Sequence, residues 1–409
     1  MQTHRASLEI SRFAIWFFLT RPAAKYGFYS LMVGLLAIQV QAQQTNSEPR
    51  IAKVPTAASS GELRFQRIFA DSESVSTQVI RLDKIPGNQE RPVVTAMCVS
   101  ANGELLAAAG DDHAIRIVNL KTGQTQATLM GHRDWVQCAE FSPSNNLLAT
   151  CSHDGTLRTW SVTDVPRSLQ TYNVEHALLT LAFLDDEQLY TAGFGSNIYR
   201  LNTHQNTIRI DHTCECNDIR SITCTPDRLW MAYGGRDGII RIRPTAVNES
   251  PTIGHDEHAG ERTIPLHFHR IRSIQFSADG NQLTSVGEDR RIVHYDMLQR
   301  KATRQTEIGG GKLMGLCQLE PNLFAIAGSD NSIRIYSDID QRVLVKLVGH
   351  DGSVCILKKT GNHIISGSFD TTIRIWDIDQ AISSSTSQGR YVHPVASQFE
   401  DSGAGDDIK

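Results

Sequence analysis

Two short stretches of this 409-residue chain hold the side chains best suited to chemistry. The first is residues 254–258 (GHDEH), which His267 and His269 follow. Imidazole and carboxylate groups can bind zinc or a similar metal, so His255, His258 and His269 are weak metal candidates. The alternative is a polar surface loop in which His267 has a structural role. No cysteine joins the loop, so we favour this alternative and predict no resident metal and no cofactor.

The second stretch is residues 212–216 (HTCEC), where two thiols lie beside a histidine. Such thiols can hold a metal or become oxidised. We expect no disulfide between Cys214 and Cys216, because their close spacing would strain the bond. The chain has eight cysteines, too few for a disulfide scaffold. The other six fall in predicted strands, where free cysteine behaves as a small apolar residue.

An aspartate recurs along the chain at nearly constant spacing. The matching positions are Asp112, Asp154, Gly195, Asp237, Asp289, Asp330 and Asp370. Successive positions are 40–42 residues apart except for one step of 52 residues, which marks an insertion near residues 247–270. An aspartate at such a position can accept hydrogen bonds from the backbone N–H groups of a tight turn.

Each repeat contains three runs with strand character and a weaker fourth. In the second repeat the clear runs are residues 136–141, 147–151 and 156–160. Short strands between Gly, Asn, Asp and Pro turns indicate an all-β array. Four strands in a repeat of about 40 residues make one blade of a β-propeller. The sequence therefore predicts an all-β, seven-bladed β-propeller of four-stranded antiparallel blades.

Over residues 76–379 the chain resembles the WD-repeat β-propeller family. The motifs that carry the resemblance are the Gly-His and Trp-Asp pairs of that family, here at Gly131-His132, Gly349-His350, Trp160-Ser161 and Trp376-Asp377. In the family an N-terminal strand completes the last blade. The resemblance assigns that role to residues 76–82, because the last repeat lacks a good fourth strand of its own.

The resemblance implies that the repeated polar residues are structural. Family blades contain a hydrogen-bonded tetrad, and the matching residues are His132, Thr150, Asp154 and Trp160, and again His350, Ser366, Asp370 and Trp376. The other turn aspartates are Asp112, Asp237, Asp289 and Asp330. Gly195 and Leu201 cannot form a tetrad, so we expect the third blade to be the loosest.

Five arginines also recur, each four residues after the turn position. They are Arg116, Arg158, Arg241, Arg334 and Arg374. They resemble a basic ring, but we expect each to pack its stem on a blade strand and keep its guanidinium group in solvent.

Family members often bind partners on the face that carries the loops into the innermost strands and the turns before the third strands. The residues that match this face are Trp135, His153, Phe194, Arg236, Arg270 and Phe369. Trp, Phe and Arg are enriched in interface hot spots. The alternative is that these side chains only cover the ends of adjacent blades.

The N-terminal 42 residues have the pattern of an export signal. Arg21 and Lys25 precede an uncharged stretch, residues 26–40, and small residues end at Ala42. The apolar run is shorter than the roughly 20 residues that cross a bilayer. We predict a cleaved signal peptide and a chain in the periplasm or at the cell surface. The alternatives are an uncleaved anchor, or a misassigned start and a cytoplasmic chain.

The rest of the chain divides into three parts. Residues 43–75 are predicted to be a linker, 76–381 the propeller and 382–409 a disordered tail.

Composition narrows the function classes. With 40% hydrophobic and 21% charged residues the chain is neither a coiled coil nor wholly disordered. A formal net charge of −4 argues against nucleic-acid binding. No phosphate-binding Gly loop, nucleophile elbow or zincin motif is present. We therefore predict a non-enzymatic, monomeric platform for a protein or peptide, with membrane contact only through an uncleaved N-terminus. The alternative is an exported propeller enzyme, or a metal-binding or small-ligand-binding protein, that uses the insertion at residues 254–269.

Overall fold

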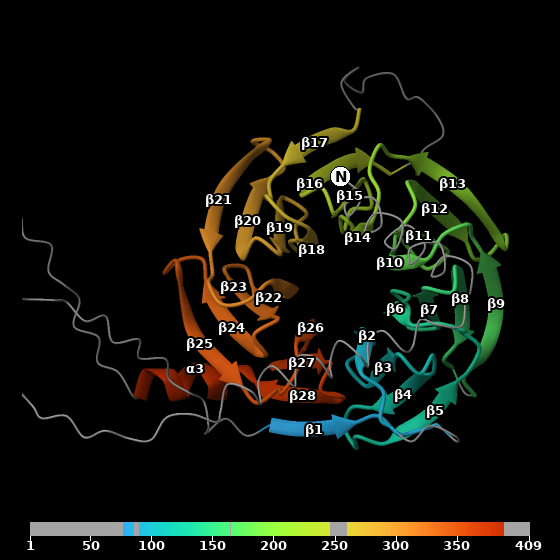
Figure 1. Ribbon diagram of the computed structural model, residues 1–409, viewed down its shortest axis with the longest axis horizontal. Helices are drawn as coiled ribbons and strands as arrows, with labels where there is room; N and C mark the ends of the chain where they lie inside the picture. Colours follow the sequence, from blue (N-terminus) through green and yellow to red (C-terminus); the bar gives the residue numbers. More distant parts are fainter. Residues whose placement is uncertain (1–76, 86–89, 164, 246–259, 388–409) are drawn as a thin grey trace, which may run out of the picture. The chain divides into compact units, whose positions relative to one another are not determined.

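Seven four-stranded antiparallel sheets surround a central axis (Figure 1). The computed structural model describes residues 77–85, 90–163, 165–245 and 260–387. The predicted fold class is confirmed: this part of the chain is a seven-bladed β-propeller. Predictions for residues 1–42, 43–75 and 388–409 fall outside the described residues.

In the first six blades the strands follow one another from the axis to the outside in chain order. Blades 1 to 3 contain β2 (Val94–Val99), β3 (Leu105–Gly110), β4 (Ile115–Asn119) and β5 (Thr125–Leu129); β6 (Val136–Phe141), β7 (Leu147–Ser152), β8 (Thr156–Ser161) and β9 (Arg167–Asn173); and β10 (Leu178–Phe183), β11 (Gln188–Gly193), β12 (Asn197–Asn202) and β13 (Thr207–Thr213). Blades 4 to 6 contain β14 (Ile219–Cys224), β15 (Trp230–Gly235), β16 (Ile239–Pro244) and β17 (Arg262–Pro265); β18 (Ile271–Phe276), β19 (Gln282–Gly287), β20 (Arg291–Asp296) and β21 (Lys301–Glu307); and β22 (Leu313–Glu320), β23 (Leu323–Gly328), β24 (Ser332–Ser337) and β25 (Arg342–Val348).

The seventh blade joins the two ends of the described chain. It contains β26 (Val354–Thr360), β27 (His363–Ser368), β28 (Thr372–Asp377) and, as its outermost strand, β1 (Thr77–Arg81). The register runs from Thr77 opposite Trp376 to Arg81 opposite Thr372, and Figure 1 shows β1 beside β28. The predicted closing strand is therefore confirmed. Because the ring is closed, every blade has a neighbouring blade on both sides.

The apolar core is divided among the junctions between blades. One cluster joins Ile117 of blade 1 to Leu148 and Trp160 of blade 2, and every other pair of neighbouring blades shares a cluster of the same kind. The second strand of each blade is accordingly buried on both faces, whereas β9, an outermost strand, is mostly exposed. This gradient explains why runs such as LLATCS at β7 are almost continuously apolar or small.

Side chains of the innermost strands also hydrogen-bond across every junction. The seven links are Cys355 Sγ to Val94 O at 3.2 Å, Thr95 Oγ1 to Val136 O at 2.6 Å, Phe183 N to Glu140 Oε2 at 3.3 Å, Ile222 N to Thr180 Oγ1 at 3.1 Å, Ile274 N to Ser221 Oγ at 3.0 Å, Gln318 N to Gln275 Oε1 at 3.0 Å and Lys359 Nζ to Glu320 Oε1 at 3.0 Å. Each link gives a partner to a polar group near the axis.

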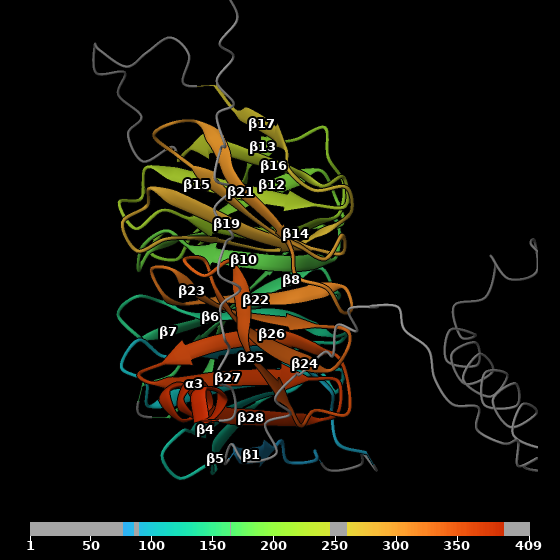
Figure 2. The ribbon, with the colours of Figure 1, turned by 90° about the vertical axis from the view of Figure 1, so that its left-hand side faces the viewer.

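The chain differs from expectation after the last strand. Helix α3 (Ile378–Ser387) covers residues 382–387, which we expected to be disordered. Asp377 Oδ1 accepts a hydrogen bond from Gln380 N at 2.8 Å, the arrangement of an N-cap. Ile378 and Ala381 are buried in the core cluster between blades 6 and 7, and Figure 2 shows α3 against β25 and β28. In the part of the chain described, no helix has the length and apolarity needed to cross a bilayer.

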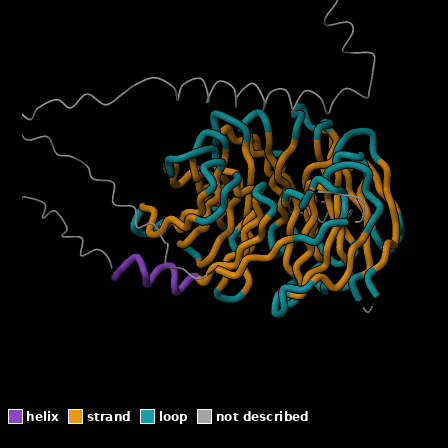
Figure 3. Tube along the Cα trace, turned by 60° about the horizontal axis from the view of Figure 1, so that its bottom comes forward, coloured by secondary structure: helices purple, strands orange, loops and turns teal. Residues whose placement is uncertain are grey.

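The connections between strands gather at the two rims of the ring (Figure 3). We call one of them the first rim: it carries the turns between the second and third strands of each blade and the loops from each outermost strand to the next innermost strand. Because strands alternate in direction, all these connections lie at the same end of the blades.

Closure by β1 can be tested at Ile80, which is buried against the core between blades 7 and 1. Ile80→Ala should lower the free energy of unfolding by about 2–5 kcal/mol, because it leaves a cavity at the seam of the ring. Denaturant unfolding measures this loss. Gln78→Ala, at an exposed position of the same strand, is the control, and equal effects of the two variants would contradict the role of β1.

Candidate functional site

Polar networks fix the turns of the first rim, which position the candidate site. In blade 2, His132 Nδ1 lies 3.0 Å from Asp154 Oδ2 and its Nε2 lies 2.8 Å from Thr150 Oγ1. Trp160 Nε1 donates to the same Thr150 oxygen at 2.8 Å. All four predicted tetrad residues are thus in one buried chain of hydrogen bonds.

Blade 7 repeats the arrangement. His350 Nδ1 lies 2.7 Å from Asp370 Oδ2, its Nε2 lies 2.8 Å from Ser366 Oγ, and Trp376 Nε1 donates to Ser366 at 2.9 Å. In both blades burial lowers the pKa of the histidine more than its aspartate raises it. An imidazole held neutral and saturated with partners serves to fix the turn.

A third network of this kind is in blade 5. His267 Nδ1 lies 3.0 Å from Asp289 and its Nε2 lies 2.8 Å from Ser285 Oγ. Tyr295 occupies the place of the tryptophan, opposite Leu283 in the register. The sequence signal is the distance of 22 residues from His267 to Asp289, which equals that from His132 to its aspartate.

The remaining turn aspartates are paired with arginine. Arg116 Nη1 donates to Asp112 at 2.9 Å, Arg241 Nη1 lies 2.8 Å from Asp237, and Arg334 Nη1 donates to Asp330 at 3.2 Å. All three arginines are buried. Our expectation that their guanidinium groups lie in solvent was therefore wrong. Each of these three aspartates, which have no histidine within reach, is thus ion-paired with the arginine four residues later.

Blade 3 uses neither arrangement, since Gly195 stands at its turn. Tyr199 occupies the position of the recurring arginines, and the next residue, Arg200, donates through Nε to Gln188 Oε1 at 2.9 Å and lies 3.9 Å from Asp211. Leu201 is fully buried as an ordinary core residue. That this blade is the loosest stays a prediction.

Three predicted face residues form a continuous aromatic strip on the first rim. The rings of Trp135 and His153 are stacked at 6.2 Å between centroids, and His153 lies 5.7 Å from Phe194. Trp135 and Phe194 remain 42% and 44% exposed. Burial lowers the pKa of His153, whose neutral ring completes an apolar surface across blades 2 and 3.

A cationic group continues the aromatic strip towards the axis. The Arg220 guanidinium lies over the Phe194 ring at 5.0 Å and is ion-paired with Asp218. Asp218 in turn contacts Arg270 at 3.1 Å, and Arg270 contacts Glu288 at 3.1 Å. The chain of charges thus joins blades 4 and 5, and the contact of Arg220 with Phe194 extends it to blade 3.

Glu288 is shared by several cations. Arg272 and Lys312 lie 2.6 and 2.8 Å from its carboxylate. Burial would raise the pKa of Glu288, but hydrogen bonds and charges from Lys312, Arg272 and Arg270 outweigh it and lower the pKa to about 2. Four cations therefore share two carboxylates, those of Asp218 and Glu288, at this part of the rim.

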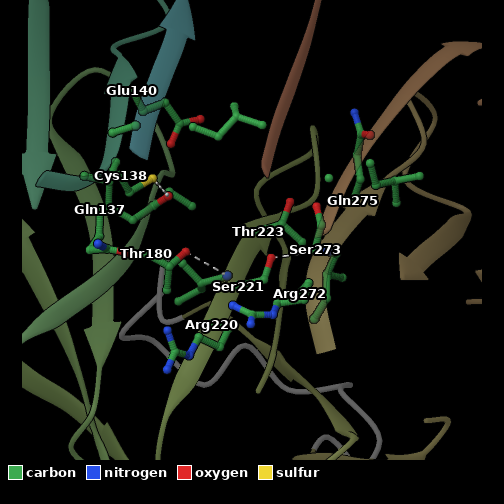
Figure 4. A pocket seen from close by; sticks show the side chains of 18 of the residues that line it. Gln137, Cys138, Glu140, Thr180, Arg220, Ser221, Thr223, Arg272, Ser273 and Gln275 are labelled. Atoms are coloured by element: carbon green, nitrogen blue, oxygen red, sulfur yellow. Dashed lines mark hydrogen bonds between the residues drawn. The ribbon is translucent and has the colours of Figure 1, made fainter. Parts of the chain in front are cut away.

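The cations border a central cavity of about 360 Å³, lined by all seven innermost strands. Figure 4 shows Arg220 and Arg272 at one end and Glu140 at the other. Burial raises the pKa of Glu140, and the charge of Lys358 opposes the shift.

The other predicted face residues lie apart from the aromatic strip. Phe369 is 42% exposed on blade 7, and its ring makes none of the aromatic contacts found among the described residues. Arg236 is exposed at the turn of blade 4.

Only one of the three metal candidates lies in the part of the chain that the structure describes. His269 is exposed before β18, whereas His255 and His258 lie outside the described residues. Over the described ranges, no group of three or more His, Cys, Asp or Glu side chains is arranged to hold a metal ion.

Our expectation for the paired cysteines was wrong. Cys214 and Cys216 form a disulfide with their Cα atoms 5.1 Å apart, inside the range that disulfides span. The chain doubles back after β13, so the two Cβ atoms approach each other despite the single intervening residue. Both half-cystines are buried in the core between blades 3 and 4.

Comparison with known families identifies the repeats. Residues 80–119, 123–161, 261–296 and 341–377 match the family described as WD domain, G-beta repeat. The chain contains WD40 repeats. The last three matched segments hold the His132, His267 and His350 networks, and the first holds the Arg116–Asp112 pair.

Several known proteins are similar to this chain over much of the ring. Apoptotic protease-activating factor 1 of Rattus norvegicus is 24% identical over 67% of this chain and 21% of its own length. The transcriptional corepressor LEUNIG_HOMOLOG of Arabidopsis thaliana is 22% identical over 68% and 34%, and the small ribosomal subunit protein RACK1 of Drosophila melanogaster is 28% identical over 40% and 51%. The alignments thus span about half or less of these relatives.

The histidine networks can be tested at Asp154. Asp154→Ala removes the acceptor for His132, the Arg133 N–H and Thr156. It should lower the free energy of unfolding by about 1–3 kcal/mol, because buried donors lose their acceptor. Glu187→Ala, at an exposed turn, is the control. Loss of a binding activity with unchanged stability would instead assign Asp154 to a functional site.

Proposed function

We propose that this chain is a non-catalytic protein-interaction platform that binds a protein or peptide on the first rim of its propeller. The observation that supports this most directly is the aromatic strip. Trp135 and Phe194 leave large apolar rings half in water, and their stacking with His153 holds them in fixed positions. Rigid aromatic groups beside an arginine have the composition of an interface hot spot.

Charge indicates which partner segment would fit. The aromatic strip ends at Arg220, beyond which Arg270, Arg272 and Lys312 outnumber the carboxylates of Asp218 and Glu288. The surface therefore favours a segment with an apolar anchor and acidic residues beside it. WD40 propellers generally serve as scaffolds, and one relative is named as a corepressor, which supports the same class of function.

We also propose that the chain is exported. The pattern of residues 1–42 is the main support, and the Cys214–Cys216 disulfide suits an oxidising compartment. The six other cysteines lie buried or half-buried in strands. Cell fractionation and N-terminal sequencing of the purified protein test the proposal. A mature chain that starts at Gln43 is expected, and an intact chain in the cytoplasm would contradict it.

The platform is tested by capture of partners from cell-envelope and cytoplasmic extracts. Trp135→Ala and Phe194→Ala should each weaken a specific partner's binding by about 2 kcal/mol or more, because each removes a central apolar anchor. Titration of the captured partner against wild type and variants measures the loss.

The matched control is Leu298→Ala. Leu298 is 77% exposed in the turn between β20 and β21, on the opposite rim, so its removal should leave binding unchanged. Circular dichroism must show all three variants folded. Equal binding by the three variants and wild type would place the partner elsewhere and contradict the proposal.

A further inference from the structure

Two free cysteines face each other in blade 2. Cys138 of β6 is paired with Cys151 of β7 in the antiparallel register, directly after a β-bulge. Both side chains pack in the core cluster between blades 2 and 3. Residues directly opposite in an antiparallel pair have Cα atoms about 4.5–5.5 Å apart, and a disulfide spans such a distance.

The pair is distinctive within the ring. At the same register position the other blades pair Ala96 with Ala109, Thr180 with Ala192, Ser221 with Gly234, Ser273 with Val286, Gly315 with Ala327 and Ile356 with Gly367. Those pairs join small, apolar or hydroxyl side chains. Blade 2 alone among these sheets has a thiol on both strands, so the repeat itself does not require thiols there.

The two thiols differ in access. Cys138 lines the central cavity (Figure 4), whereas Cys151 is fully buried behind it. A hydrogen bond from Cys151 holds the pKa of Cys138 below its usual range, and burial raises the pKa of Cys151. An oxidant in the cavity would therefore meet the more acidic thiol first, with a second thiol beside it.

We propose that Cys138 and Cys151 form a redox modification site, at which a hydroperoxide that enters the central cavity drives formation of a cross-strand disulfide. The Cys138 thiolate attacks the peroxide, its sulfur becomes a sulfenic acid, and the O–O bond breaks with release of hydroxide, or of alkoxide from an alkyl peroxide. The Cys151 sulfur then attacks the sulfenic sulfur, the S–O bond breaks and water leaves. Two thiols are thereby oxidised, and one peroxide is reduced.

The site lies directly beneath the aromatic strip. Trp135 precedes β6 and His153 follows β7, and His153 N donates to Trp135 O at 3.0 Å, just beyond the paired cysteines. A covalent bond between the strands would alter the spacing on which the stacked rings depend. This consequence rests on the proposed function, whereas the oxidation itself does not.

The test uses the full-length protein, reduced and freed of reductant, then treated with hydrogen peroxide. Remaining thiols are blocked with N-ethylmaleimide before tryptic digestion. Residues 134–158 form one tryptic peptide that contains both cysteines and no other. We expect this peptide to appear unblocked and lighter by two hydrogen atoms than its reduced form.

Cys355 is the internal control, because it lines the same cavity but sits in a bulge without a thiol opposite it. Burial raises its pKa to about 12, so at equal peroxide we expect about tenfold less oxidation at Cys355 than at Cys138.

In Cys151→Ser the Cys138 sulfenic acid should persist and be trapped by dimedone. Full blocking of both thiols in the treated wild type, or oxidation of Cys138 without a disulfide, would overturn the proposal.

The affinity of the captured partner tests separately whether the disulfide affects the aromatic strip. The captured partner is titrated against the reduced protein, the oxidised protein and Cys151→Ser treated in the same way. A change in affinity confined to the oxidised wild type links the disulfide to the aromatic strip. A disulfide with unchanged affinity would overturn the link but leave the modification site, and absence of any partner would count against the proposed function alone.

Discussion

Each blade of this propeller has two apolar faces, and neither can be buried within the blade itself. A twisted four-stranded sheet is one layer thick, so its core must come from the neighbouring sheets on both sides. The seven apolar clusters lie between blades, and seven side-chain hydrogen bonds join the innermost strands across the same junctions. The pairing of β1 with β28 joins two distant segments of the chain and completes blade 7 at its junction with blade 1.

The polar residues that hold the turns differ from the residues that we propose bind a partner. Asp154 and Asp112 are buried and saturated, one by histidine and the other by arginine, and they hold turns in place. Trp135, in the loop before β6, and Phe194, in the turn after β11, lie on the same rim and are partly exposed to solvent. A rigid turn beneath an exposed ring lowers the conformational entropy lost on binding. The repeated residues therefore hold the turns, and residues that do not repeat form the proposed binding surface.

Blade 2 illustrates how these layers meet. Its turn carries the His132 network, its loops carry Trp135 and His153, and beneath them lies the pair Cys138 and Cys151. The network resists change because every donor has an acceptor, whereas the thiol pair can change covalently without breaking a buried ion pair. The structural network, the proposed binding surface and the proposed redox site thus lie along the same two strands.

The sequence by itself determined the number of blades, because a period of 40–42 residues depends only on local spacing, and its resemblance to the WD-repeat family placed the closing strand and two of the tetrads. Only the tertiary structure decided which aspartates take arginine, how Cys214 reaches Cys216, and that Trp135, His153 and Phe194 form one surface while Phe369 lies apart. These contacts join residues from different strands or blades, so their geometry follows from the closed ring and has no signature in the spacing of any one repeat.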